Sequence, residues 1–394
     1  MVVSLAQVKS RTDLPVVVLA YLYFVMLGIP GAMLGVAWPS MRQTFALPLA
    51  DAGLLLTASA AGYTLSSFYS GRLVYRLGYT RLLILSSVSG IAGAAGFVLA
   101  PAWWVVLLAG LVMGIGGGTI DAGLNTYFAA NYGPRLMSWL HASYGVGTTF
   151  GPYMMTRLIE AEQPWQWGYV VVALANLLLI AGIALTARQW RQPETPAAPS
   201  GAKTSLRQTL RLPVVWLNTA LIILIVGVEF SPSQWTPSLF TESRAMTLEL
   251  AGLMVTLYWG SFTVGRILFG LIGNSLKPAF ALRACMLATI LGAVLVWWDA
   301  GPMVNFLGVV IMGLAQAPIF PLIVTATPER VGSEHAANAI GFLISAAGVG
   351  IAVLPGLVGV VADNLGLELI GLLLVVMAAV MFALHEVLAH HKAS

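Results

Sequence analysis

Charged residues are scarce in this sequence. Lys, Arg, Asp and Glu make up 9% of the 394 residues, whereas a soluble domain carries roughly 25%. Apolar residues make up 59%, and the mean hydropathy is +0.88. So few charges cannot cover the surface of a water-soluble protein of this size. The composition therefore excludes an ordinary soluble protein and indicates one that is embedded in a membrane.

Cysteine is almost absent as well. Cys285 is the single cysteine, so neither an intrachain disulfide nor a thiolate metal cluster is available. The sequence also lacks the Walker A, HExxH and GxSxG patterns, and it has no soluble segment that could hold ATP. These absences predict a protein that is not an enzyme and that needs no cofactor and no metal. Any uphill movement of a solute would then depend on an ion or solute gradient.

Long apolar segments fill most of the chain. A helix needs about 20 apolar residues to cross the hydrocarbon core, and clusters of Pro, Gly and charge cut this chain into twelve such segments. Their lack of alternating polarity excludes membrane strands, so we predict an all-α membrane protein. The expected spans are 14–38, 52–72, 80–100, 105–131, 136–158, 167–187, 213–236, 250–272, 280–298, 303–326, 336–361 and 366–387.

An internal repeat relates the two halves of the chain. AGLLLT from Ala52 and AGLMVT from Ala251 are near copies that lie 199 residues apart. This unit is too long for a solenoid, whose periods run roughly 20–50 residues, but it suits the duplicated bundles of secondary transporters. We therefore predict a six-helix bundle over 1–187, a flexible cytoplasmic linker over 188–212 and a second six-helix bundle over 213–394.

The basic residues are distributed unevenly around these spans. With both termini in the cytoplasm, only Arg42, Arg157 and Arg244 of the 19 basic residues lie outside, as the positive-inside rule requires. We expect a protein that is integral to the plasma membrane, in bacteria the inner membrane. The pI near 9.2 then reflects topology and attraction to membrane lipids, and it indicates no nucleic-acid partner.

Asp121 is one of two carboxylates that lie away from the ends of the expected spans, and a charge costs about 2.5 to 3.5 kcal/mol at the bilayer centre. It lies roughly 15 Å from the inner end of the fourth span, at a rise of about 1.5 Å per residue. Asn125 follows one helical turn later on the same face. An acid at this depth is a candidate proton carrier. Alternatively, Asp121 only bonds a neighbouring helix and holds the bundle together.

Glu229 is the second carboxylate and lies in the seventh span, within VGVEFSPSQW. Pro232 removes a backbone donor and should kink this helix. Gln234 and Trp235 follow. An acid, an amide and an indole near one kink resemble a sugar-binding surface, in which the ring stacks on the sugar and the polar groups bond its hydroxyls. Trp235 could equally belong to an aromatic belt at the membrane interface.

Two further polar residues in the spans are candidates. His141 enters the fifth span near its inner end, where it could relay protons near neutral pH. It could equally be a satisfied polar side chain close to the cytoplasmic interface. Gln316 in the tenth span is a lesser candidate for contact with a solute.

The loop between the second and third spans, GRLVYRLGYTR, resembles the signature loop of the major facilitator superfamily. Gly71, Arg76 and Gly78 match that signature, and Tyr75 stands where the family has an acid. In the family this loop is thought to latch the inward gate through charge pairs with neighbouring helices. The resemblance therefore implies a gating role for Gly71, Arg76 and Gly78.

Segments over nearly the whole chain are similar, more narrowly, to the fucose:proton symporter branch of sugar transporters. They are LHASYGVGTTFGP, VGVEFSPSQW, YWGSFTVGRILFG and GLAQAPIFPLIVTATPERVG. The resemblance implies the twelve-helix major facilitator fold. It also implies proton coupling through Asp121, which matches the acid on the fourth helix of that branch.

We therefore predict a secondary active transporter that moves a small polar solute, a sugar, by alternating access coupled to protons. The solute, protons or sodium ions, and membrane lipids are the expected partners, and the duplicated halves make a monomer sufficient. Two alternatives stay open: a proton-driven exporter of amphipathic compounds or lipids, and a non-transporting sensor on the same scaffold. The proton-coupling candidates are Asp121 and Glu229, and the substrate-binding candidates are Asn125, His141, Glu229, Gln234, Trp235 and Gln316.

Overall fold

The structure is a computed structural model that describes residues 14–132, 134–191, 205–272, 277–332 and 334–390. Within these ranges the chain is built of helices and contains no strand, which confirms the predicted all-α class. Part of the predicted linker 188–212, and the chain termini at 1–13 and 391–394, lie outside the described residues.

The helices of the N-terminal half are α1 (Leu14–Phe45), α2 (Ala52–Leu99), α3 (Trp103–Asn131), α4 (Pro134–Glu160) and α5 (Gln166–Thr186), with short turns η1 (Leu49–Asp51) and η2 (Ala187–Gln189). Those of the C-terminal half are α6 (Leu206–Thr209), α7 (Pro213–Ser238) with its π-helical extension η3 (Leu239–Ser243), α8 (Leu248–Ile272), α9 (Pro278–Trp298), α10 (Pro302–Gln316), α11 (Ile319–Val331), α12 (Ala336–Leu365) and α13 (Leu369–His390).

Eleven of the twelve expected spans coincide with a helix or with part of one, and the tenth, 303–326, covers α10 and part of α11. Ten candidate membrane helices among the described residues are long and apolar enough to cross a bilayer. The two expected spans missing from that set are 52–72, the first part of α2, and 136–158, within α4. Both segments are long enough to cross, but they are richer in Gly, Ser and Thr than the others.

Two spans need comment. The second and third spans are two helical parts of α2 that meet at Gly78, where the backbone is not helical (φ 73°, ψ 167°). Only glycine adopts this backbone conformation without strain, so the junction depends on the residue type at this position. The tenth span, by contrast, is broken into α10 and α11, because Pro318 lies at the break and has no backbone N–H to donate.

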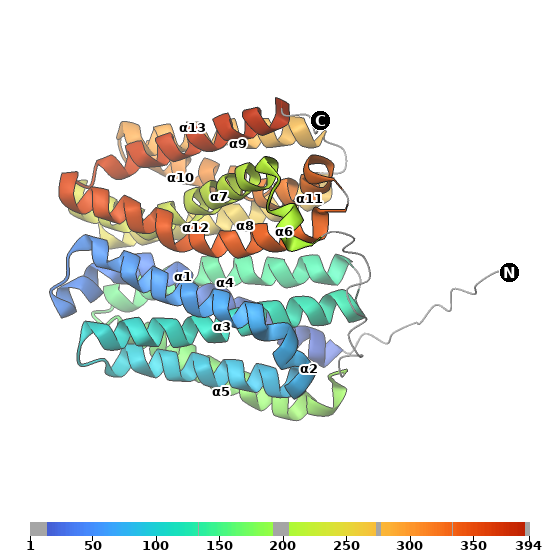
Figure 1. Ribbon diagram of the computed structural model, residues 1–394. Helices are drawn as coiled ribbons and strands as arrows, with labels where there is room; N and C mark the ends of the chain where they lie inside the picture. Colours follow the sequence, from blue (N-terminus) through green and yellow to red (C-terminus); the bar gives the residue numbers. More distant parts are fainter. Residues whose placement is uncertain (1–13, 133, 192–204, 273–276, 333, 391–394) are drawn as a thin grey trace.

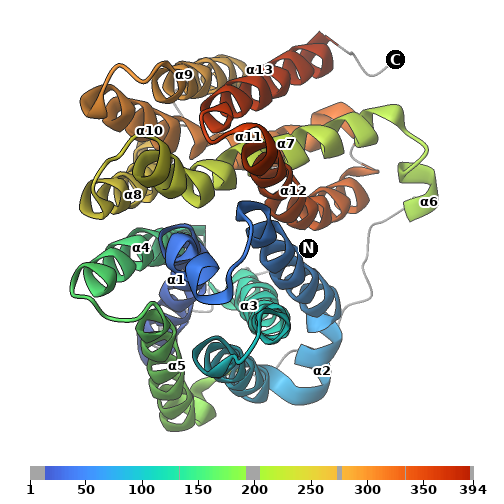
Figure 2. The same cartoon turned by 90° about the vertical axis from the view of Figure 1, so that its left-hand side faces the viewer.

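The helices form two groups that pack side by side, α1–α5 against α7–α13 (Figures 1 and 2). Contacts between the groups run mainly along three helix pairs, α4 with α8, α2 with α12, and α1 with α7. Figure 2 views the molecule along the helices and shows α4, α1 and α2 of one group along the boundary with the other group.

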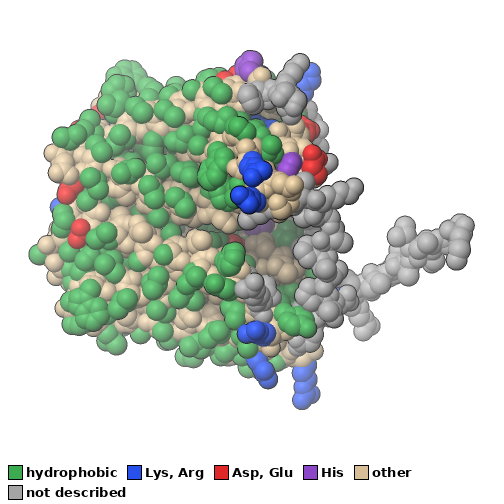
Figure 3. Space-filling view, viewed as in Figure 1, with side chains coloured by type: hydrophobic (Ala, Val, Ile, Leu, Met, Phe, Trp, Pro, Cys, Tyr) green, Lys and Arg blue, Asp and Glu red, His purple; other side chains and the backbone are tan. Residues whose placement is uncertain are grey.

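The two ends of this bundle differ. One end, which we call the paired end, carries Arg42, Glu242 and Asp363, and there the two halves are bonded to each other. The opposite end, which we call the open end, carries the first and last described residues, Leu14 and His390 (Figure 1). Most Lys and Arg side chains visible in Figure 3 lie at the open end, and the surface there is hollowed between the halves.

Candidate functional site

A cavity of about 370 Å³ lies between the two halves and is lined by α1, α2, α3, α4, α5, α7, α8 and α12. Most of its lining is apolar, and a smaller set of polar side chains converges on it. A few polar groups in an apolar cleft of this size are typical of small-molecule sites. The polar lining residues are Ser59, Tyr63, Ser86, Asp121, His141, Tyr144, Tyr169, Asn176, Ser233, Gln234 and Arg266.

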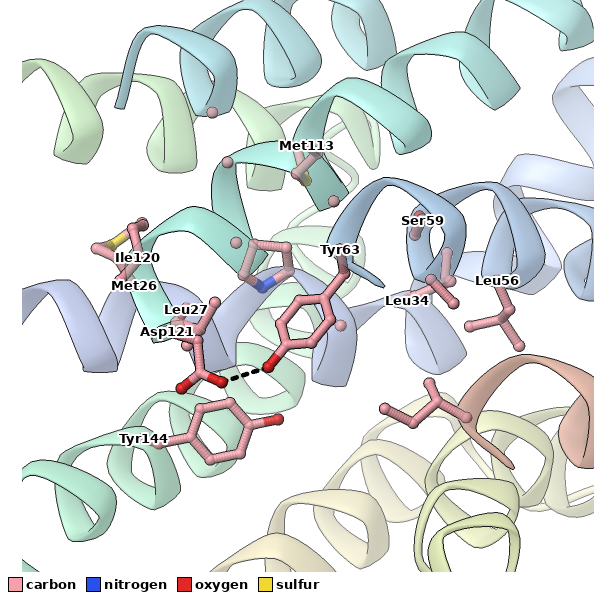
Figure 4. Close-up of a pocket in the computed structure, with 18 of the residues that line it drawn as sticks. Met26, Leu27, Leu34, Leu56, Ser59, Tyr63, Met113, Ile120, Asp121 and Tyr144 are labelled. Atoms are coloured by element: carbon pink, nitrogen blue, oxygen red, sulfur yellow. Dashed lines mark hydrogen bonds between the residues drawn. The ribbon is translucent and has the colours of Figure 1, made fainter. Parts of the chain in front are cut away.

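Asp121 on α3 is held by donors on both carboxylate oxygens. The Tyr63 hydroxyl on α2 donates to Oδ2 (Figure 4), and the Asn125 amide donates to Oδ1 at 2.9 Å. Helices α2 and α3 approach closely here, because Gly118 packs against the Tyr63 backbone and a Cβ at that position would lie 2.2 Å from the Tyr63 carbonyl oxygen. A small residue is therefore needed to bring the tyrosine to the acid.

Tyr144 and His141 on α4 line the cavity beside this acid. Figure 4 shows the Tyr144 ring next to Asp121, and no hydrogen bond to the Tyr144 hydroxyl is found among the described residues. The His141 ring packs edge-on against Phe24 of α1, with ring centroids 5.7 Å apart. One face of α4 therefore brings a hydroxyl and an imidazole to the same cavity as the carboxylate.

On α7, Phe230, Ser233 and Gln234 face the cavity. Their spacing of three and four residues places them on one side of the helix. Glu229 lies beside that face: it is 6% exposed and is not part of the cavity lining. Its backbone carbonyl oxygen accepts a bond of 2.6 Å from the Tyr258 hydroxyl of α8.

The prediction that Trp235 lines the cavity is wrong. Its indole Nε1 donates to the Pro355 carbonyl oxygen of α12 at 2.8 Å, and the ring is fully buried against Gly359. Successive residues of an α-helix are rotated by about 100°, so Gln234 faces the cavity while Trp235 faces α12. The indole joins two helices of the C-terminal half and belongs neither to the cavity nor to an interfacial belt.

Of the other predicted binding residues, Asn125, Glu229 and Gln316 also lie outside the cavity lining. Asn125 acts on the cavity only through its bond to Asp121. Gln316 is 1% exposed at the end of α10, and neither of its amide atoms has a partner among the described residues. Asp121, His141 and Gln234 do line the cavity, and their roles in transport stay predictions.

The residues that match the signature loop lie inside α2. Gly71 lies in the first helical part of α2, and Gly78 is the non-helical residue at which the two parts meet. Arg76 is exposed and takes part in none of the ion pairs among the described residues. The gating role that the resemblance implied for this loop stays a prediction.

Sequence reasoning missed Tyr63, Tyr144 and Arg266, all of which line the cavity. Arg266 carried a usable signal, because it is a charged residue inside the expected span 250–272 and such residues are functional candidates by default. Its guanidinium lies over the Phe262 ring, 4.4 Å from the centroid. The tyrosines carried no such signal, since they become site residues only through the packing of α2 and α4 on α3.

The sequence profile of the Major Facilitator Superfamily matches residues 20–342. The chain belongs to this superfamily. Among its relatives, the glucose/mannose transporter GlcP of Bacillus subtilis is 20% identical over 349 residues, covering 86% of each chain. Bypass of stop codon protein 6 of Saccharomyces cerevisiae is 21% identical and covers 92% of this chain and 80% of its own length.

Solved structures of the superfamily have the same fold. The nucleoside transporter NupG superposes with a TM-score of 0.73 at 14% identity, over 96% of this chain and 99% of NupG. A D-xylose-proton symporter superposes with a TM-score of 0.73 at 13% identity, over 93% and 97% of the two chains. The protein is therefore a membrane transporter of the major facilitator fold and not an enzyme.

Proposed function

We propose that this protein is a secondary active transporter for a small polar solute, a sugar or a sugar derivative, and that it works by alternating access coupled to protons. The observation that carries the proposal is the cavity between the halves, in which Asp121 is the one carboxylate among the lining residues. The printed substrates of its relatives, glucose and mannose for GlcP and D-xylose for the symporter, support the solute class.

Proton coupling would act through the bonds of Asp121. An ionised carboxylate accepts from both the Tyr63 hydroxyl and the Asn125 amide. A protonated carboxyl gains an O–H donor and becomes a weaker acceptor, so these two bonds would weaken or rearrange. Because Tyr63 and Asp121 line the cavity on different helices, uptake of a proton would change the shape and hydrogen-bonding capacity of the solute site.

Alternating access is supported by the difference between the two ends. The halves are bonded at the paired end, and the surface is hollowed at the open end (Figure 3). The excess of basic side chains at the open end favours a cytoplasmic position for it. We therefore propose an inward-facing conformation in a plasma membrane with both termini in the cytoplasm, and rocking of the two bundles, 1–187 and 213–394, about the cavity.

One feature of the cavity favours a second candidate function, the export of amphipathic compounds. Leu34 and Leu56 line the cavity on the far side of Tyr63 from the carboxylate, and Met113 lines it from α3 (Figure 4). A ligand with an apolar part would bury it against these side chains, whereas the hydroxyls of a sugar would gain nothing there. Transport assays must therefore include both classes of compound.

Uptake into proteoliposomes tests the proposal. Vesicles with an imposed proton gradient would be given a labelled panel of neutral sugars, sugar acids and hydrophobic dyes. We expect accumulation of one sugar or sugar acid against its gradient, which Asp121→Asn abolishes while leaving exchange of that solute intact, because exchange needs no net proton movement. Expulsion of dyes without uptake of any sugar or sugar acid would overturn the proposal in favour of the exporter.

A further inference from the structure

Arg266 is a cation in the cavity without a protein counter-ion in contact. It lines the cavity from α8, and none of the ion pairs among the described residues includes it. Its guanidinium packs on the face of Phe262 at 4.4 Å, and its buried Nε has no hydrogen-bond partner there. Charged residues inside membrane helices normally pair with another group, so this guanidinium is poised for a partner that the protein does not supply.

Gln234 provides a second unpaired donor in the same cavity. The residue lines the cavity from α7 and is only 4% exposed. Its buried amide Nε2 has no partner among the described residues. A buried N–H without an acceptor is unfavourable unless a ligand or a water molecule accepts its hydrogen bond. Both unpaired donors belong to the C-terminal half, whereas the cavity carboxylate belongs to the N-terminal half.

The acids nearby do not satisfy these donors. The carboxylate of Asp121 already accepts from Tyr63 and Asn125. Glu229 is close enough to Arg266 for their charges to interact, but it lies outside the cavity lining and forms no ion pair within 4.0 Å among the described residues. The C-terminal wall of the cavity therefore has an excess of donors, one of them permanently charged.

An oxyanion is the group that such a wall would bind. A guanidinium binds a carboxylate or a phosphate through a planar fork of N–H groups. An amide N–H can donate a further hydrogen bond to one of the oxygens of the same anion. Arg266 is the one Lys or Arg side chain among the lining residues, so the wall offers a single fixed positive charge. That balances a carboxylate, which carries one charge, better than a phosphate monoester, which carries nearly two.

We propose that the solute is a hydroxylated monocarboxylate, a sugar acid of the aldonate or uronate class, whose carboxylate is bound by Arg266 and Gln234. The inference rests on the proposed function, because the same cavity is the solute site. It has a consequence for the charge moved. One proton and one monoanion cross together without net charge, whereas one proton and a neutral sugar carry one positive charge across.

Binding to the purified protein in detergent tests the donors directly. The probes are D-gluconate and D-glucuronate, with D-glucitol and D-glucose as their neutral counterparts and D-glucose 6-phosphate as the phosphate arm. We expect at least one sugar acid to bind about tenfold or more tightly than its neutral counterpart. Arg266→Gln should remove this preference, and Arg266→Lys should retain part of it because the charge is kept.

The matched control is Arg283→Gln, which removes an arginine of the same half that pairs with Glu386 and lies outside the cavity lining. It should leave the preference unchanged, and size-exclusion profiles would show which variants are folded. Equal binding of acid and neutral probes by the wild type, an unchanged preference in folded Arg266→Gln, or preferred binding of the phosphate would each overturn the inference.

Flux measurements separate failure of this inference from failure of the proposed function. We expect gluconate or glucuronate uptake to follow the pH gradient and to be insensitive to a membrane potential imposed with potassium and valinomycin. Proton-driven uptake of a neutral sugar that responds to the potential would overturn the sugar-acid inference and leave the proposed function intact. Absence of any proton-driven uptake would overturn both.

Discussion

The paired end and the open end of this transporter use their charged residues differently. At the paired end, Arg42 of α1 pairs with Glu242 of η3 at 2.9 Å, and the Leu49 backbone N–H donates to Asp363 of α12 at 2.9 Å. Both contacts join the two halves. At the open end, Arg283 pairs with Glu386. Both residues belong to the C-terminal half, so this ion pair does not join the halves.

This difference indicates which contacts would have to break during transport. A half-exposed ion pair contributes only about 0.2–1 kcal/mol, so the polar contacts across the paired end form a weak closure. A weak closure suits a protein that has to separate its halves at one end as they join at the other. The stronger network at the paired end, around Arg244, lies within the C-terminal half and would move with it as a unit.

The largest effect should come from a bulky side chain where the halves touch. A Cβ added at Gly53 of α2 would lie 2.9 Å from the Cα of Gly356 on α12. Gly53→Leu should therefore hold the paired end apart and reduce proton-driven uptake more than tenfold, because the halves could not close there. Labelling of a cysteine placed at the paired end, in a chain whose Cys285 is replaced, would report the opening.

Gly341→Leu is the control, since nothing lies within 4 Å of a Cβ at that position near the open-end terminus of α12. Both substitutions add the same side chain to a helix, so they differ only in what that side chain meets. Equal uptake by the two variants would show that the contact at Gly53 does not limit transport.

Arg244→Ala should lower the stability of the fold. Its effect on transport should be smaller than that of Gly53→Leu. The Arg244 side chain is 3% exposed and bonds Glu368 at 2.7 Å, the Val296 carbonyl oxygen at 2.8 Å and Asn305 at 2.9 Å. Its loss leaves buried acceptors unpaired, which costs about 3 kcal/mol of unfolding free energy. Arg42→Ala, at a half-exposed pair, should cost under about 1 kcal/mol. Thermal unfolding of the two variants compares them.

The pH dependence of this network has a definite sign. The hydrogen bond from Arg244 holds the pKa of Glu368 below its usual value. Glu368 therefore contributes stability that is fully present above its unfolded pKa and is lost as the pH falls through its folded pKa. Acidification below about pH 4.5 should lower the Tm of the wild type more than that of Arg244→Ala. Parallel Tm curves would contradict this assignment.

The sequence predicted the helices and three of the cavity-lining residues, Asp121, His141 and Gln234. The length of an apolar run decides whether it spans a membrane, and a charge inside a span, such as Asp121, is conspicuous by itself. The cavity-facing side of a helix is not a local property. Gln234 and Trp235 are neighbours with similar sequence signals, and only the packing of α7 on α12 sends one to the cavity and the other into the core.

Asp51 offers the smallest and most specific test of the paired end. Burial and the nearby charge of Asp363 raise the pKa of Asp51 above its usual value. We therefore expect closure of the paired end to be coupled to proton uptake, with acid on that side favouring the closed form and alkali the open form. Asp51→Asn should keep the paired end closed and remove this pH dependence, because the repulsion is gone at every pH. The measurement is the labelling rate of a paired-end cysteine between pH 4.5 and 7.5, and an unchanged pH profile in Asp51→Asn would mean that another group governs closure.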